Sequence, residues 1–241
     1  MSGSVQLQKV HFSNTGKLGL IPSFNTSSKR CKVGNFLKLQ DFSICSKCYC
    51  DGGSHFTHEH TQDLLEINHE LSELKNWVQI MTDSIYQLNT LRFRWFASGD
   101  IQSSDMLEKI NQIAYNLPDI KFWLPTRELK VLEKFFIEKK NKKAPNLSII
   151  LSENFFDDFS IKKGKKTFYK NHKGKMVDIT KLLKFVKLAS ATNDPKIATC
   201  PVSQSKVKGN KKTCLELKCD RCFNFDDKGP IIYLNERKRK F

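Results

Sequence analysis

The residues with the most chemistry to offer are eight cysteines, which fall into two groups near the two ends of the chain. The first group begins with Cys31 and continues through the stretch Cys45-Ser-Lys-Cys48. Two thiolates at this C-x-x-C spacing can bind one metal ion or one cluster from a single tight turn. The spacing predicts a metal site in the loop 31–50, with Cys31 folding back as the third ligand.

The number of thiolates decides which metal suits this first site. Three thiolates with an open position suit a [4Fe–4S] cluster, whereas four suit structural zinc. Cys50 ranks fourth, because the alternation of an extended chain would point its side chain away from Cys48. His55, His58 and His60 follow and could supplement a zinc site, although histidines in such a stretch are more often solvated.

The second group has four cysteines with the spacing of a closed metal site. Cys219 and Cys222 form another C-x-x-C pair, Cys214 lies just before them, and Cys200 ends a predicted strand. Four thiolates fit either structural zinc or a fully ligated auxiliary iron–sulfur cluster. The segment 200–223 is therefore a second predicted metal-binding motif.

Strands and helices are predicted to alternate between the two groups. Runs rich in apolar and aromatic residues predict strands at 17–24, 91–98, 120–125, 147–152 and 196–200. Helical spacing predicts two helices within 60–89 and single helices at 103–117, 127–140 and 178–189. Since alternating strands and helices form parallel sheets, we expect an α/β fold with a partial (β/α) barrel-like sheet, in a single domain spanning residues 1–241.

Residues able to do chemistry follow the predicted strands. They are Ser98, Gly99 and Asp100 after the second strand, Arg127 after the third, Glu153 after the fourth and Cys200 after the fifth. Parallel α/β folds place their sites at the carboxyl ends of the strands. We therefore expect these residues to meet the first cysteine group at one mouth, although turn and cap residues also collect at strand ends.

The charge balance favours polyanionic partners. The chain has 41 Lys and Arg against 25 Asp and Glu, a formal charge of +16, which suits phosphate contacts, although the composition of an AT-rich genome explains it equally well. The basic insertion 161–175 interleaves lysines with Phe168 and Tyr169, a combination that suits single-stranded DNA or RNA as well as a solvated hairpin. The basic tail 236–240 has the same two interpretations.

The sequence predicts no membrane partner. The longest apolar runs, such as 147–151, are far too short to cross a bilayer, and the first residues lack the apolar core of a secretory signal. We therefore expect a cytoplasmic protein. In that reducing compartment, eight cysteines favour metal ligands over disulfides.

Several motifs occur in a characteristic order. They are the stretches 13–19, 45–50, 93–101, 122–128, 146–152 and 199–223. Together they resemble the bacteriophage-associated family known as gene product eighty-eight, over about residues 13–223. The resemblance implies a phage origin and a bacterial host cell, and it implies no particular reaction. This chain departs from the family pattern in a long insertion between Cys31 and Cys45, and in Phe96, where the family carries a polar residue, often His.

A more distant resemblance is to radical S-adenosylmethionine enzymes, which are partial (β/α) barrels. Their first strand leads into a three-cysteine loop that ends in Cys-x-x-Cys and an aromatic residue, as do Cys45, Cys48 and Tyr49. Their second strand ends in a turn that binds the amino group of the cofactor, where this chain has 98–100. The departure is the missing Cys-x3-Cys spacing, because Cys31 lies farther upstream.

This second resemblance implies roles for individual residues. It implies that Cys31, Cys45 and Cys48 hold three irons of a [4Fe–4S] cluster and that S-adenosylmethionine binds the fourth. Arg127 and Glu153 are then candidates for the carboxylate and the ribose of that cofactor, while an Arg–Glu pair or a helix cap is the simpler role for each.

Two hypotheses of different kinds follow. The first is a phage iron–sulfur enzyme of the radical S-adenosylmethionine type that acts on a nucleic acid or a nucleotide-like substrate. The second is a non-catalytic phage protein that binds nucleic acid or a host factor and is stabilised by zinc at one or both cysteine groups.

Overall fold

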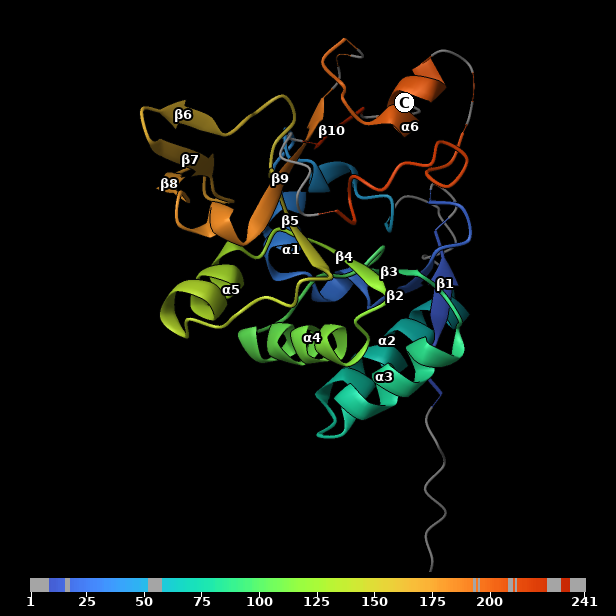
Figure 1. Ribbon diagram of the computed structural model, residues 1–241. Coiled ribbons are helices and arrows are strands. Elements are labelled where there is room, and N and C mark those ends of the chain that lie inside the picture. The colour runs from blue at the N-terminus through green and yellow to red at the C-terminus, as the bar shows by residue number, and fades with distance from the viewer. Residues whose placement is uncertain are drawn as a thin grey trace, which may run out of the picture.

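A seven-stranded sheet, six strands of which run parallel, forms the centre of the protein in the computed structural model (Figure 1). The structure describes residues 9–15, 18–51, 58–192, 194, 196–207, 210, 212–224 and 231–234. The strands, in sheet order, are β1 (Phe12–Asn14), β2 (Pro22–Phe24), β3 (Arg92–Trp95), β4 (Lys121–Thr126), β5 (Leu147–Ser152), β9 (Val186–Thr192) and β10 (Ile231–Leu234). Only β1 runs antiparallel to its neighbour.

The helices confirm most of the predicted helical segments. They are α1 (Lys32–Lys38), α2 (Glu59–Glu73), α3 (Trp77–Gln87), α4 (Ser104–Asn116), α5 (Leu129–Glu133), which continues as a π-helix (Lys134–Glu138), and α6 (Pro201–Val207). Ser103 begins α4 as a cap, since its hydroxyl accepts the Met106 N–H at 3.1 Å. Figure 1 shows α2 to α5 on one side of the sheet and the C-terminal segment with α6 on the other.

Both faces of the sheet are buried, as expected for parallel strands. The helix-covered face contributes the main core, which includes Phe93, Trp95, Phe122, Leu124, Ile149 and Leu151. Alternate residues of the same strands enter a second core on the opposite face, together with cysteines of the second group: Trp123, Ile150, Ala189, Ile231, Cys200, Cys214 and Cys222. The strands therefore carry the second cysteine group on the face away from the helices.

The prediction of a helix at 178–189 is wrong. A 3-10 helix covers Leu182–Lys184, and strand β9 follows over Val186–Thr192. The local spacing fits a helix, but β9 pairs with β5 on one side and β10 on the other. This long-range pairing overrides the local pattern.

The predicted strand at 196–200 is also wrong. Thr199 and Cys200 are in a loop whose N–H groups both donate to the Ile232 carbonyl oxygen at 3.0 Å. The strand beside this loop is β10, which comes later in the chain and which the sequence pattern did not predict. The predicted strand at 17–24 is confirmed only over Pro22–Phe24.

The basic insertion 161–175 forms most of a small antiparallel sheet with strands β6 (Ile161–Lys163), β7 (Lys166–Lys170) and β8 (Met176–Asp178). Tyr169 anchors it to the main sheet, because its ring is buried and its hydroxyl donates to the Ser152 carbonyl oxygen at 2.8 Å. The small sheet is thus attached at the carboxyl end of β5.

The parallel strands follow one another in chain order, which is the winding of a (β/α) barrel, but the described sheet is open, with β1 and β10 as its edges. The fold is therefore a mixed α/β fold with a mostly parallel sheet and no closed barrel. Among the described residues, no helix combines the length and the apolar composition that spanning a membrane requires.

Candidate functional site

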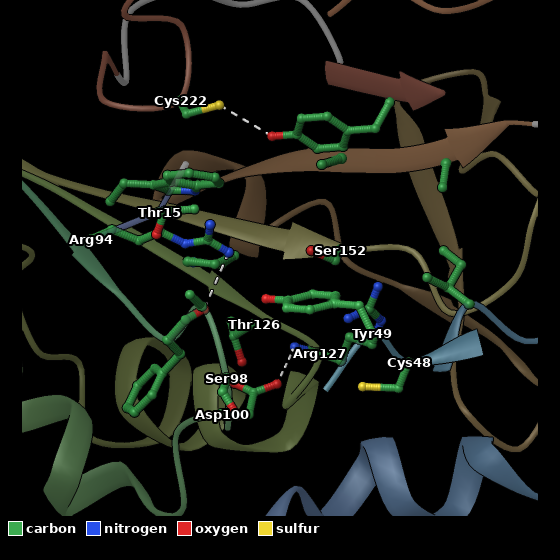
Figure 2. A pocket seen from close by; sticks show the side chains of 18 of the residues that line it. Thr15, Cys48, Tyr49, Arg94, Ser98, Asp100, Thr126, Arg127, Ser152 and Cys222 are labelled. Atoms are coloured by element: carbon green, nitrogen blue, oxygen red, sulfur yellow. Dashed lines mark hydrogen bonds between the residues drawn. The ribbon is translucent and has the colours of Figure 1, made fainter. Parts of the chain in front are cut away.

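All eight cysteines line one cavity of about 590 Å³ at the carboxyl ends of the parallel strands. Cysteines 31 to 50 reach it from the segment that follows β2, and cysteines 200 to 222 reach it from the segment between β9 and β10. None of them forms a disulfide. The two groups, far apart in sequence, therefore share one pocket, part of which is drawn in Figure 2.

Helix α1 arranges the first cysteine group. Cys31 is its N-cap residue, and Cys45 begins a 3-10 turn, Cys45–Lys47, that leads to Cys48. Gly34 lies beside the first two thiols: a Cβ atom there would be 2.8 Å from the Cys31 Cβ, 3.7 Å from the Cys31 Sγ and 3.8 Å from the Cys45 Sγ. The long insertion between these cysteines thus supplies a helix that brings both sulfurs beside one residue without a side chain.

Cys50 does not point away from Cys48, contrary to the alternation argument. The two thiols are hydrogen-bonded, and this bond lowers the pKa of Cys48 to about 6 while it raises that of Cys50. Burial raises the pKa of Cys31 and of Cys45. Cys48 is therefore the thiol of this group that most readily supplies a thiolate at neutral pH.

Two cations lie in the field of these thiols. Burial opposes the charge of Lys38, but its hydrogen bond with Asp51, at 2.6 Å, raises its pKa, as do Cys48 and Cys31. Burial lowers the pKa of Arg127, but the nearby Cys45 and other groups raise it, so that the net shift is upward. Positive charge beside several thiols favours their ionised, metal-binding form.

The second cysteine group is held by hydrogen bonds to the surrounding chain. The Cys219 N–H donates to the Cys214 carbonyl oxygen at 2.9 Å, and the Cys222 Sγ lies 3.1 Å from the Tyr233 hydroxyl (Figure 2). The buried Lys187 on β9 donates from Nζ to the carbonyl oxygens of Arg221, at 2.8 Å, and of Asn224. A buried ammonium thus fixes the tight turn that carries Cys222.

The Ser98-Gly99-Asp100 turn lines the pocket, but Asp100 is already engaged. Its carboxylate oxygens accept the N–H groups of Ile101, at 2.8 Å, and Arg127, at 3.0 Å, and burial raises its pKa. Gly99 packs against the backbone of Thr26. The turn therefore joins the ends of β2, β3 and β4, and its predicted contact with a cofactor stays a prediction.

Arg127 and Glu153 are placed differently. Arg127 lines the pocket, with its Nε donating to the Glu153 carbonyl oxygen at 3.3 Å. The Glu153 carboxylate is buried and accepts the Ser160 N–H at 3.0 Å and the Ser160 hydroxyl, and burial raises its pKa to about 7. Among the described residues, Ser152 lines the pocket and Glu153 does not.

The histidines do not join the described site. His58 and His60 are exposed around the start of α2 and do not line the pocket, while His55 and the basic tail 236–240 lie outside the described residues. Within the described ranges, no group of three His, Cys, Asp or Glu side chains is arranged to hold a single metal ion.

Asn25, just after β2, shapes the pocket, and no pattern in the sequence predicts this role. Its amide oxygen accepts the N–H groups of Ala97, at 2.6 Å, and Ser98, at 3.0 Å, and its amide nitrogen donates to the Ser13 hydroxyl at 2.6 Å. This side chain fixes the path of the chain beyond β3. A single polar residue at a strand end gives no pattern from which such a role could be predicted.

Glu128 links the stability of the fold around α1 to pH. Its Oε1 accepts the Val33 N–H of α1 at 2.9 Å, and burial raises its pKa from 4.5 to about 7. The folded state holds the Glu128 proton more tightly than the unfolded state. The stability that protonated Glu128 contributes is therefore complete below pH 4.5 and is lost as the pH rises through 7.

We therefore expect Glu128→Gln, which keeps the acceptor for Val33, to reduce the loss of stability between pH 5 and pH 8 by about 2 kcal/mol. Urea unfolding at the two pH values measures this difference. Glu128→Ala should be less stable than wild type at pH 5, since it also removes the acceptor. An unchanged slope in the glutamine variant would contradict the assignment.

Comparison with known proteins gives one match. A family model described as gene product 88 matches residues 22–227, a range that includes both cysteine groups. No curated protein and no solved structure matches significantly, so these comparisons do not support the resemblance to radical S-adenosylmethionine enzymes. Phe96 packs its ring into the main core against Phe24 and Trp95.

Proposed function

The chain belongs to the gene product 88 family of bacteriophage proteins, and we propose that this member is an iron–sulfur enzyme of the radical S-adenosylmethionine type, acting on a nucleic acid or a nucleotide-like substrate. One observation carries the proposal. Cys31, Cys45 and Cys48 follow the first strand of a parallel set whose members succeed one another in chain order, and all three line the pocket at the carboxyl ends of those strands.

The residues present fit a cluster in three respects. The Cys31 and Cys45 sulfurs lie 3.7 Å and 3.8 Å from the point where residue 34 would place a Cβ, so the glycine lets both thiols lie close to one stretch of backbone. Lys38 and Arg127 supply positive charge beside thiolate ligands, which are negative. The thiolates of a cluster bind different irons, so their arrangement differs from that of the ligands of one ion.

When bound, a reduced cluster of this type supplies the electron that cleaves S-adenosylmethionine and so starts hydrogen abstraction from the substrate. The protein's own part is to bind and orient. The terminal nitrogens of Arg127 have no hydrogen-bond partner among the described residues and would hold a carboxylate, with the Nε fixed by Glu153. Tyr49, Trp123 and Phe156 line the pocket with aromatic surface that limits the access of water.

Cys200, Cys214, Cys219 and Cys222 are the proposed ligands of a second centre in the same pocket. Four thiolates leave no open position, so this centre would be structural zinc or a fully ligated auxiliary cluster, without a direct role in the reaction.

Metal analysis of anaerobically purified protein tests the proposal. We expect iron and acid-labile sulfide, with broad absorbance near ~400 nm from thiolate-bound clusters, and cleavage of S-adenosylmethionine under reduction. Colourless protein that contains only zinc and leaves S-adenosylmethionine intact would overturn it. That result would instead support the second candidate, a zinc-stabilised nucleic-acid-binding protein.

The surface of the β6–β8 sheet favours this second candidate. Among the described residues, five of its exposed lysines form no ion pair: Lys162, Lys163, Lys165, Lys173 and Lys175. Tyr169 is buried and Phe168 is half-buried, so the Tyr169 ring is not exposed for stacking on a base. Any contact of this sheet with nucleic acid would rest on lysine–phosphate attraction.

Replacing Lys162, Lys163 and Lys165 by glutamine should therefore weaken binding to single-stranded DNA and reduce the slope of log K against log salt by about 2. Fluorescence anisotropy over a series of salt concentrations measures the slope. The matched control replaces Lys130, Lys134 and Lys140, which are also exposed, and removes the same charge from the α5 side. Equal losses in both triple variants would indicate that net charge, and not this sheet, drives binding.

A further inference from the structure

Arg94 and Trp123 form a paired unit on the pocket face of the sheet. They are register partners on β3 and β4, and the Arg94 guanidinium lies 4.5 Å from the centroid of the Trp123 ring. One terminal nitrogen of Arg94 donates to the Phe96 carbonyl oxygen at 3.3 Å, and both side chains line the pocket (Figure 2 labels Arg94). The ring and this hydrogen bond hold the guanidinium in one orientation.

This unit has buried donors without partners. The Arg94 Nε and the Trp123 Nε1 have no hydrogen-bond partner among the described residues, and Trp123 is only 6 % exposed. The buried Thr15 hydroxyl, which also lines the pocket, is likewise unpartnered. Arginine and tryptophan nitrogens can only donate, and an unmade buried hydrogen bond is costly, so this wall is suited to a ligand that accepts.

The side chains with fixed charge that line the pocket are mostly positive, which also suits a ligand that accepts hydrogen bonds. The described lining residues include five cations but one carboxylate, that of Asp100, whose oxygens already accept backbone N–H groups. The cations are Lys38, Lys47, Arg94, Arg127 and Arg221. Lys38 is paired with Asp51, and apart from the cysteines the lining still carries more positive than negative charge, which favours an anionic ligand.

The charge of Arg94 reaches side chains beside both cysteine groups. It acts electrostatically on Tyr49, next to Cys48, and on Tyr233, whose hydroxyl contacts Cys222. A ligand held by Arg94 would therefore be positioned near both groups.

We infer that Arg94, Trp123 and Thr15 form a subsite for a phosphate group of the substrate, held by charge-assisted hydrogen bonds on the wall of the pocket that the two cysteine groups share. A phosphate offers several acceptor oxygens and up to two negative charges, which matches the donors and the charge surplus better than a carboxylate does. The subsite rests on the proposed function only in taking this pocket as the substrate site.

Isothermal titration calorimetry with inorganic phosphate tests the subsite. We expect Arg94→Gln to weaken phosphate binding about tenfold or more. The matched control is Arg92→Gln, on the same strand and face, because Arg92 lies over the Phe223 ring at 5.8 Å but does not line the pocket. The Arg92→Gln control should bind phosphate as the wild type does. Acetate should bind to the wild type and to this control much more weakly than phosphate.

Three results would overturn the inference: no phosphate binding by the wild type, equal losses in the two arginine variants, or acetate binding as strong as phosphate binding. Loss of phosphate binding in Cys48→Ser but not in Arg94→Gln would place the anion on a metal, and would also overturn it. Metal content, measured on each variant, separates this outcome from a failure of the proposed function. If Arg94→Gln does not fold, Arg94→Lys and Thr15→Val are measured instead, and each should weaken phosphate binding severalfold.

Discussion

Cys48→Ser is expected to lose the metal of the first cysteine group completely. A serine hydroxyl stays protonated at neutral pH, whereas the Cys48 thiol, with its pKa lowered to about 6 by the hydrogen bond from Cys50, supplies a thiolate. If the group holds a [4Fe–4S] cluster, bound iron should fall by about four atoms per chain. Reductive cleavage of S-adenosylmethionine should fall to background. Iron and sulfide analysis after anaerobic reconstitution measures the first effect, and chromatography of the reaction products measures the second.

Cys222→Ser is the matched control for this experiment. It removes a thiol from the same pocket but from the other group, 3.1 Å from the Tyr233 hydroxyl. We expect it to keep the iron of the first group and to lose the metal of the second. Identical metal losses in the two variants would indicate that the groups do not form separate centres, and full retention in Cys48→Ser would rule out Cys48 as a ligand.

Gly99→Ala is expected to destabilise the fold by about 3 kcal/mol, the sum of backbone strain and overpacking. Gly99 has a φ of +85°, and a Cβ there would lie 2.1 Å from the Thr26 Oγ1 and 2.9 Å from the Thr26 carbonyl oxygen. The Thr26 N–H also donates to the Ser98 carbonyl oxygen at 3.2 Å, so the two segments cannot separate without losing this bond. Urea unfolding measures the change as a lower midpoint with an unchanged slope.

Gly174→Ala separates strain from packing. Gly174 has a φ of +75°, close to that of Gly99, but a Cβ there would meet no atom within 4 Å. It should therefore cost only the strain of the left-handed conformation, about 1 kcal/mol. Equal losses in the two variants would contradict the role of Thr26.

These two experiments address different parts of one arrangement. The Cys48 variant tests what the pocket holds, and the Gly99 variant tests how the ends of β2 and β3 are joined beneath it. A protein in which Gly99→Ala lowers stability while correctly folded molecules keep their metal would show that the turn is structural.

The sequence by itself determined the elements whose signals are local. The strand at 147–152, the two helices within 60–89 and the capped helix near 103–117 follow from apolar spacing and from Ser103, and each is present in the structure. The two cysteine groups are also a local signal, because thiols two residues apart can share a ligand whatever the surrounding fold.

Only the tertiary structure decided which residues meet. Strand β9 exists because β5 and β10 pair with it on either side, although its own residues had predicted a helix. Asp100 and Glu153 were equivalent in the sequence, as acidic residues after strands, yet the Asp100 turn lines the pocket and Glu153 turns to Ser160. Contacts between distant segments depend on strand pairing and packing, which local propensity does not encode. For the same reason, the placement of Cys31 and Cys222 on one cavity, and of Arg94 against Trp123 on the wall of that cavity, could be seen only once the parallel sheet was assembled.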